Sequence, residues 1–122
     1  MLARALVLAS LLALLIAGSA SAAATHTCRS ADLRYPFMPG GPNTFGVFKL
    51  MVTGGTCRTA HRAAKAWQTK FEANLKAGSE KLPTSAGGFD FTQLPAREAQ
   101  TYRLRGRRGT TSIRFDYVVP NG

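Results

Sequence analysis

The sequence predicts a small α+β domain, in which one amphipathic helix packs on one face of a small antiparallel sheet, in the order β-α-β-β-β. Three observations favour this class. One stretch carries apolar residues at helical spacings of three and four, and several others alternate apolar and polar residues, as half-buried strands do. A turn bounded by glycines joins the last two strands. With 122 residues, the chain is long enough for one domain with one modest core.

Residues 1–22 have the three-part pattern of a secretory signal peptide. Arg4 supplies the positive start, Ala5–Ala17 is an uncharged apolar run, and Ala20-Ser21-Ala22 is a small-residue processing site. The alternative, a membrane anchor, would need about 20 apolar residues, and this run is too short. We expect cleavage directly after the processing site or two residues later. The product would be secreted, or periplasmic if the host has an outer membrane.

The only two cysteines, Cys28 and Cys57, are predicted to form a disulfide bond. An even cysteine count in an exported chain usually indicates pairing, and two cysteines allow only one connectivity. Closing this loop would stabilise the fold by roughly 3–4 kcal/mol. The alternative, a reactive thiol, lacks a histidine and an acidic or amide partner at a recognisable spacing.

Residues 23–44 are predicted to be an irregular N-terminal segment, which Cys28 tethers to a single α+β domain over residues 45–122. Prolines and glycines between residues 36 and 42 interrupt any regular element. We expect the apolar side chains of Tyr35, Phe37 and Met38 to fold over the edge of the core as a lid. An exposed patch for a ligand is the alternative.

Residues 45–53 are predicted to form the first strand, with Phe48, Leu50 and Val52 on one face and Val47, Lys49 and Met51 on the other. A glycine turn follows, and Thr56 is suited to cap the N-terminus of a helix. Gly78 is suited to end it. The apolar face of this helix is formed by Cys57, Ala60, Ala64, Trp67, Phe71 and Leu75.

The remaining residues are predicted to form a loop over residues 79–88, a short strand over 89–92 and a closing hairpin. With Arg107 and Arg108 at the hairpin tip, Leu104 would lie opposite Thr111. Strand alternation then divides the side chains between two faces. The core face is formed by Tyr102, Leu104, Ile113, Phe115 and Tyr117, and the solvent face by Arg103, Arg105 and Arg114.

Several segments between Leu50 and Phe115 resemble a group of small, largely uncharacterised secreted bacterial domains that are common in actinobacteria. The segments are Leu50-x-Val52-x-Gly54-Gly55-Thr56-Cys57-x-x-Ala60, Gly88-Phe89-x-Phe91, Tyr102-Arg103-Leu104-Arg105-Gly106 and Ile113-Arg114-Phe115. The group has Gly-x-x-Cys at a helix start, Gly-aromatic-x-Cys, and aromatic-x-Cys-x-x-Gly in a closing hairpin. Phe91 and Leu104 stand where the group carries its second cysteine pair, which implies a hydrophobic contact there. The resemblance implies a fold and export but no reaction.

Basic residues dominate the charged composition. The 16 lysines and arginines outnumber the 6 acidic residues and give a net charge of +10. Such a charge favours anionic partners, although it also promotes solubility. The strongest local cluster is formed by Arg103, Arg105, Arg107, Arg108 and Arg114, whose planar guanidinium groups suit phosphate, sulfate or carboxylate. The alternative role for these arginines is a solvated face that blocks strand-to-strand aggregation.

We therefore expect a secreted, non-catalytic interaction module whose partner is an anionic polymer or envelope component. We expect a monomer with no cofactor, no metal site, no specific nucleic-acid partner and no membrane span. One alternative is a small secreted hydrolase acting on phosphodiesters, with His61 as its general base. Another is an inhibitor of a second secreted protein, presented through the loops at residues 36–42 or 79–87.

Overall fold

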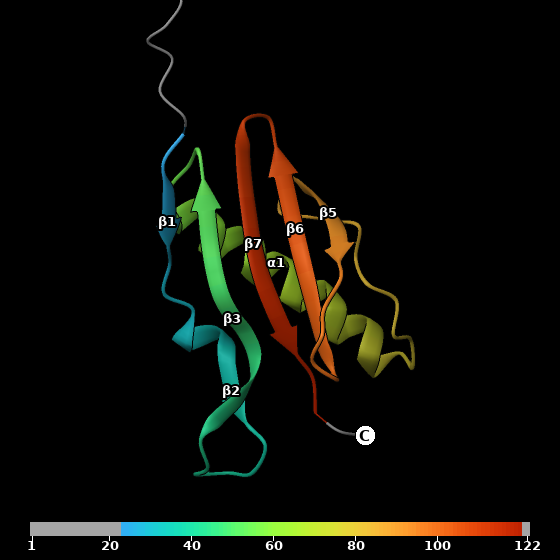
Figure 1. Cartoon of the computed structure of the whole chain (residues 1–122). Coiled ribbons are helices and arrows are strands. Elements are labelled where there is room, and N and C mark those ends of the chain that lie inside the picture. Colours follow the sequence, from blue (N-terminus) through green and yellow to red (C-terminus); the bar gives the residue numbers. More distant parts are fainter. Residues whose placement is uncertain (1–22, 121–122) are drawn as a thin grey trace, which may run out of the picture.

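The computed structural model describes residues 23–120, and the predicted signal peptide lies outside them. The chain forms one antiparallel sheet with a single long helix across one of its faces (Figure 1). This arrangement confirms the predicted α+β class with one helix on one side of a sheet. Within residues 23–120, no helix is both long enough and apolar enough to cross a membrane.

The sheet has the strand order β1-β3-β7-β6-β5-β4, and β2 also pairs with β3. Because β1 pairs with the end of β3 and β2 with its beginning, the N-terminal segment runs along the outer edge of β3. The strands are β1 (Thr25–Thr27), β2 (Arg34–Pro36), β3 (Asn43–Thr53), β4 (Ser85–Ala86), β5 (Phe89–Leu94), β6 (Thr101–Arg108) and β7 (Thr111–Val118).

The helix α1 (Cys57–Lys76) begins and ends where the sequence predicts. The backbone N–H of Thr59 donates to the Thr56 hydroxyl at 3.2 Å, which caps the first turn. Gly78, with φ of +81°, follows the last turn. The predicted apolar face is buried except at its two ends, where Cys57 is half-buried and Leu75 is exposed.

Trp67 lies at the centre of the core. Its ring centroid is 5.0 Å from that of Phe71, 5.4 Å from that of Phe115 and 5.2 Å from that of Tyr117. Such tilted and edge-on ring contacts contribute beyond the apolar area that they bury. The helix and the inner face of the sheet therefore share one aromatic core. Among the described residues, the opposite face of the sheet carries no helix.

A β-bulge in β3 overturns the prediction that Phe48 shares a face with Leu50 and Val52. Phe48 lies opposite Asp116 while Met51 lies opposite Arg114, so β3 has one extra residue between these pairs. Lys49 occupies the bulge with φ of +54°. Val47 is consequently buried, whereas Phe48 points to the solvent face, where the Arg34 guanidinium lies 4.2 Å from its ring centroid. Leu50 and Val52 share a face as predicted, and this face packs in the core.

Residues 23–44 are more regular than the sequence predicts, because β1, β2 and a 3-10 turn, η1 (Ala31–Leu33), all lie in this segment. The backbone groups of β1 and β2 pair with the edge of β3, a long-range partner that local composition does not reveal. The predicted disulfide between Cys28 and Cys57 is present, with a Cα–Cα distance of 5.3 Å. It joins the end of β1 to the first turn of α1.

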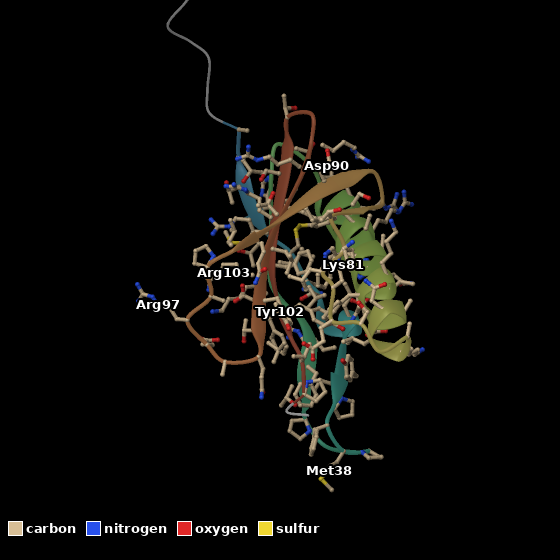
Figure 2. The ribbon with its side chains drawn as sticks, turned by 90° about the vertical axis from the view of Figure 1, so that its right-hand side faces the viewer. Met38, Lys81, Asp90, Arg97, Tyr102 and Arg103 are labelled. Atoms are coloured by element: carbon tan, nitrogen blue, oxygen red, sulfur yellow. A yellow bond between two sulfur atoms is a disulfide. The ribbon has the colours of Figure 1, made fainter. Side chains whose placement is uncertain are left out.

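The predicted lid is wrong for two of its three side chains. Phe37 and Met38 are 65% and 64% exposed, and Figure 2 shows Met38 at one extremity of the molecule. Phe37 instead packs edge-on against Phe45 of its own hairpin, with 5.7 Å between ring centroids. The β2–β3 hairpin therefore projects beyond the sheet and does not fold back over it.

The register of the β6–β7 hairpin also differs from the prediction. Its turn is Gly109-Thr110, so Arg108 pairs with Thr111 and Leu104 pairs with Phe115. Leu104's partner is thus displaced by four residues, an even number, and the two faces keep the predicted composition. Phe91 and Leu104 are both buried on the core face, where Phe91 lies opposite Gly106, so the pair is diagonal across neighbouring strands.

Candidate anion-binding face

The solvent face of the sheet carries a group of cations, which we call the basic face. It consists of Lys49, Arg103, Arg105, Arg107 and Arg114. In β6, the three arginines occupy alternate positions and so point to the same side, about 6.7 Å apart along the strand. Core residues Leu104 and Gly106 lie between them on the side of the sheet that the helix covers.

Two of these arginines face each other directly. Arg105 of β6 and Arg114 of β7 are cross-strand partners. Directly opposite side chains have Cβ atoms about 5 Å apart, at which distance like charges destabilise a sheet. Among the described residues, neither arginine forms an ion pair. This pair therefore concentrates positive charge at a position where that charge does not stabilise the sheet.

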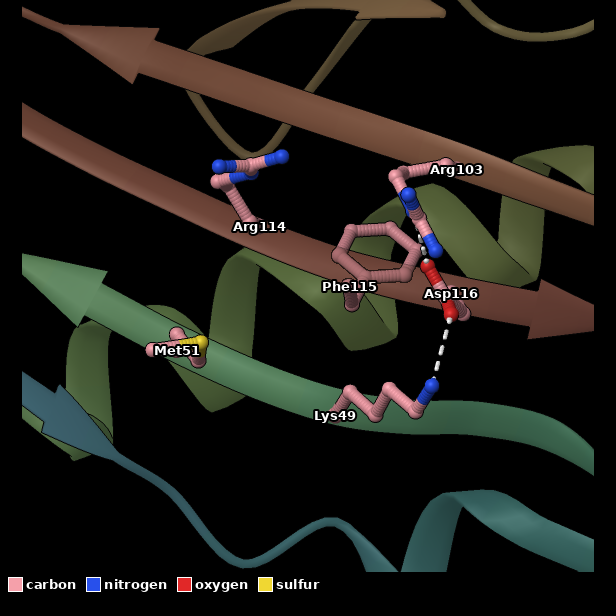
Figure 3. A pocket seen from close by; sticks show the side chains of 6 residues that line it. All are labelled: Lys49, Met51, Arg103, Arg114, Phe115 and Asp116. Atoms are coloured by element: carbon pink, nitrogen blue, oxygen red, sulfur yellow. Dashed lines mark hydrogen bonds and ion pairs between the residues drawn. The ribbon is translucent and has the colours of Figure 1, made fainter. Parts of the chain in front are cut away.

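A buried carboxylate organises one end of the basic face. Asp116 is only 5% exposed and accepts a hydrogen bond from Arg103 Nε at 3.0 Å, while Lys49 Nζ lies 3.9 Å from its other oxygen (Figure 3). The hydrogen bond and the negative charge of Asp116 raise the pKa of Arg103 above its ordinary value. Asp116 thus fixes the orientation of Arg103 and neutralises part of the local charge.

A shallow cavity of about 220 Å³ lies between these groups. Its lining combines Lys49, Arg103 and Arg114 with the carboxylate of Asp116 and the thioether of Met51 (Figure 3). The pairing of neighbouring strands brings these residues together: Met51 of β3 lies opposite Arg114 of β7, and Arg103 of β6 lies opposite Asp116 of β7. The cavity can accommodate a small anionic group beside an apolar one, and the cations around it can hold that group by charge-assisted hydrogen bonds.

The structure brings four of the five sequence-predicted arginines onto this face and excludes the fifth. Arg107 is a strand residue opposite Ser112 and not part of the turn, so it extends the row begun by Arg103 and Arg105. Arg108 points to the other side of the sheet, where its guanidinium lies 4.5 Å from the ring centroid of Phe89. The prediction of Arg108 as a tip residue is therefore wrong, because the turn lies two residues further along the chain.

Two members of this site, Lys49 and Asp116, are not predicted from the sequence. The bulge in β3 brings Lys49 beside β7, and no pattern in the sequence indicates this bulge. Only the positive φ of Lys49 in the structure marks it. Asp116 does carry a signal: it is an acidic residue at an alternate position in a strand whose other solvent-facing charge is Arg114. Strand alternation alone places it beside Arg103 once the register is known.

His61 has an acidic partner, but not in a buried site. Its Nε2 lies 2.6 Å from Asp32 Oδ2, with the two side chains 30% and 66% exposed. A general base in a hydrolase needs an orienting partner and a pocket that excludes water. Within residues 23–120, no group of three or more His, Cys, Asp or Glu side chains is arranged to hold a metal ion. The contact connects η1 to α1 on the surface.

The chain matches no protein-family model, no curated protein and no solved structure.

Proposed function

We propose that this protein is an exported, non-catalytic interaction module that binds anionic polymers through its basic face. The observation that carries the proposal is the directly opposed pair of Arg105 and Arg114. A bound phosphate, sulfate or carboxylate would turn their mutual repulsion into attraction to a shared ligand. Lys49, Arg103 and Arg107 extend the same surface, so a chain of anionic groups can contact several cations at once.

Two features support the exported location. The disulfide between Cys28 and Cys57 is of the kind that persists in oxidising compartments outside the cytosol. Ala20-Ser21-Ala22 is suited to processing by a signal peptidase, and Thr25, the first residue of β1, follows it closely. We propose that the exported form begins at Ala23 or Thr25, which leaves every strand of the sheet intact. N-terminal sequencing of the exported protein tests this directly.

The binding proposal is tested with heparin and with single-stranded DNA across a salt series. The variant Arg105→Gln/Arg107→Gln/Arg114→Gln removes three cations from the basic face. The matched control, Arg58→Gln/Arg62→Gln/Lys65→Gln, removes the same number of charges from the helix α1. Both variants therefore have the same net charge and differ only in which surface has lost it.

We expect the basic-face variant to lose most of its affinity. Because each neutralised DNA phosphate releases counterions, the slope of log K against log salt should become shallower by about 0.7 for each lost contact with single-stranded DNA. The helix control should keep the wild-type slope. Equal losses in both variants would show that only net charge matters. Unchanged binding by the basic-face variant would exclude this face as the contact surface.

A further inference from the structure

The β2–β3 hairpin ends in a cluster of apolar side chains, which we call the apolar tip. It consists of the exposed Phe37 and Met38 and the half-buried Tyr35 and Phe45. The tip projects because β3 begins at Asn43, whereas its pairing with β7 begins only at Gly46. Figure 1 shows this hairpin at the opposite end of the sheet from the β6–β7 turn.

Contacts within the hairpin hold the tip in a defined shape. The Phe45 ring centroid is 6.0 Å from that of Tyr35 and 5.7 Å from that of Phe37. The turn is closed by a hydrogen bond from the Gly41 N–H to the Met38 carbonyl at 2.9 Å, and prolines restrict the loop. Phe37 and Met38 thus present about two thirds of their surfaces to solvent from a preorganised loop.

The charge distribution around the tip is one-sided. Residues 35–48 contain no charged side chain, and this segment is bounded by Arg34 and Lys49. A third cation, Lys76, lies with Tyr35 and Leu75 around a cavity of about 410 Å³ at the end of α1. The one carboxylate in that lining, Glu72, accepts a hydrogen bond from the Tyr117 hydroxyl at 3.0 Å.

We propose that the apolar tip inserts into the interface of a membrane that contains anionic lipids. Exposed aromatic and methionine side chains suit the boundary between headgroups and acyl chains, which interfacial segments enter by about 5–10 Å. Lys76 lines the cavity beside Tyr35, which precedes Phe37 by two residues. When the tip is inserted, Lys76 therefore lies near the lipid phosphates, where a basic residue adds attraction. Arg34 stays with the protein, because its guanidinium donates to the Val47 carbonyl at 2.8 Å and to the Ser30 hydroxyl at 3.1 Å.

A lipid surface fits this tip better than a protein partner does. The tip lacks charged groups, so it offers a protein partner few of the hydrogen bonds and ion pairs that specify an interface. Insertion between lipids requires no such contacts. The proposal is independent of the basic face, because the tip lies at the end of the hairpin beyond the pairing of β3 with β7.

The test uses fluorescence of the exported form mixed with vesicles. The only native tryptophan, Trp67, is fully buried, so Trp67→Phe gives a dark background. In that background, Met38→Trp is the tip reporter. The matched control reporter is Thr110→Trp, which lies in the exposed turn at the other end of the sheet. Vesicles consist of phosphatidylcholine alone or of phosphatidylcholine with phosphatidylglycerol in equal amounts.

We expect the emission of the tip reporter to shift to the blue by about 10 nm or more with the anionic vesicles, because its indole leaves water for the interface. The emission of the control reporter should stay unchanged. In the native tryptophan background, Phe37→Ser/Met38→Ser should reduce cosedimentation with anionic vesicles at least tenfold, while Trp67 emission shows an intact core. The basic-face variant Arg105→Gln/Arg107→Gln/Arg114→Gln should retain the emission shift when it is combined with the tip reporter.

Three results would overturn the proposal. The first is cosedimentation without an emission shift of the tip reporter, which would assign binding to charge on another surface. The second is equal shifts of the tip and control reporters, which would indicate non-specific adsorption. The third is no association with either vesicle, which would leave a protein partner as the occupant of the tip.

Discussion

Changing Arg114 to glutamate should stabilise this protein while it weakens polyanion binding. Arg114 lies directly opposite Arg105, and Arg103 and Arg107 occupy the diagonal positions in β6. Like charges at opposed positions destabilise a sheet, and opposite charges there contribute roughly 0.2–1 kcal/mol relative to uncharged pairs. The variant Arg114→Glu replaces the repulsion between Arg105 and Arg114 with an attraction between Arg105 and the new carboxylate. It should therefore raise the free energy of unfolding by about 0.5–2 kcal/mol at low salt.

One neighbour reduces this gain. Asp116 lies two residues further along β7 on the same face, about 6.7 Å away along the strand, and its negative charge opposes a second carboxylate. Three cations nevertheless surround position 114, so the attraction should exceed the repulsion. The control Arg114→Gln removes the arginine repulsion without adding attraction, and should give about half of the stabilisation.

The assay is thermal and urea unfolding of the oxidised protein in low and high salt. For a domain of about 100 residues, 1 kcal/mol corresponds to roughly 4–8 °C in Tm. The advantage of the glutamate variant should shrink in 1 M salt, where the Debye length is about 3 Å. Destabilisation by Arg114→Glu, or a gain that does not depend on salt, would refute the inference that Arg105 and Arg114 repel each other. It would also remove the main support for the basic face.

Four further predictions concern the fold. Replacing Cys57 with serine should lower the free energy of unfolding by roughly 3–4 kcal/mol relative to the oxidised wild type, through loss of the disulfide, and the reduced wild type should unfold like the variant. The variant Leu104→Ala should cost about 2–4 kcal/mol, because this side chain is fully buried; a loss below about 0.5 kcal/mol would place it at the surface. Because the bulge buries Val47 and turns Phe48 to the solvent face, Val47→Ala should lower the free energy of unfolding in urea more than Phe48→Ala does. The reverse order would instead support a regular strand without the bulge. Burial raises the pKa of the Tyr117 hydroxyl, so folding stability should fall as pH rises above about 10, where tyrosine in the unfolded chain ionises first; Tyr117→Phe should flatten this dependence.

The sequence is sufficient for the helix and for the division of the sheet into two faces, because both follow from periodicity. It is not sufficient for the hairpin register, since Gly106 and Gly109 are both plausible turn residues. The structure uses Gly109 in the turn, with φ of +57°. Gly106 is required for another reason: a Cβ there would lie 2.7 Å from Cε1 of the Phe91 ring. The close approach of Phe91 to Gly106 joins residues far apart in the sequence, so no local sequence pattern predicts it.

The candidate site is predictable to the same extent. Arg103, Arg105 and Arg114 follow from strand alternation, which survives an even error in register. The exclusion of Arg108 and the strand position of Arg107 depend on where the turn lies, and the addition of Lys49 depends on the bulge.

The diagonal placement of Phe91 and Leu104 also bears on the sequence resemblance, in which these two positions correspond to a second cysteine pair. Diagonal neighbours in a sheet are about 7–8 Å apart, whereas disulfides usually need about 4.4–6.8 Å between Cα atoms. Two cysteines at these positions would therefore require the backbone to move.

Because of the bulge, the core-facing residues of β3 change from odd-numbered to even-numbered positions partway along the strand. Before Lys49, the odd-numbered Val47 faces the core, and after it the even-numbered Leu50 and Val52 do. Deleting Lys49 would join Val47 and Leu50 in uninterrupted alternation and leave both on the core side. A deletion of one residue at this point would therefore keep the two faces, whereas the same deletion in a regular strand would invert them. At this point of β3, the number of residues between the paired positions determines which side chains face the core and which join the basic face.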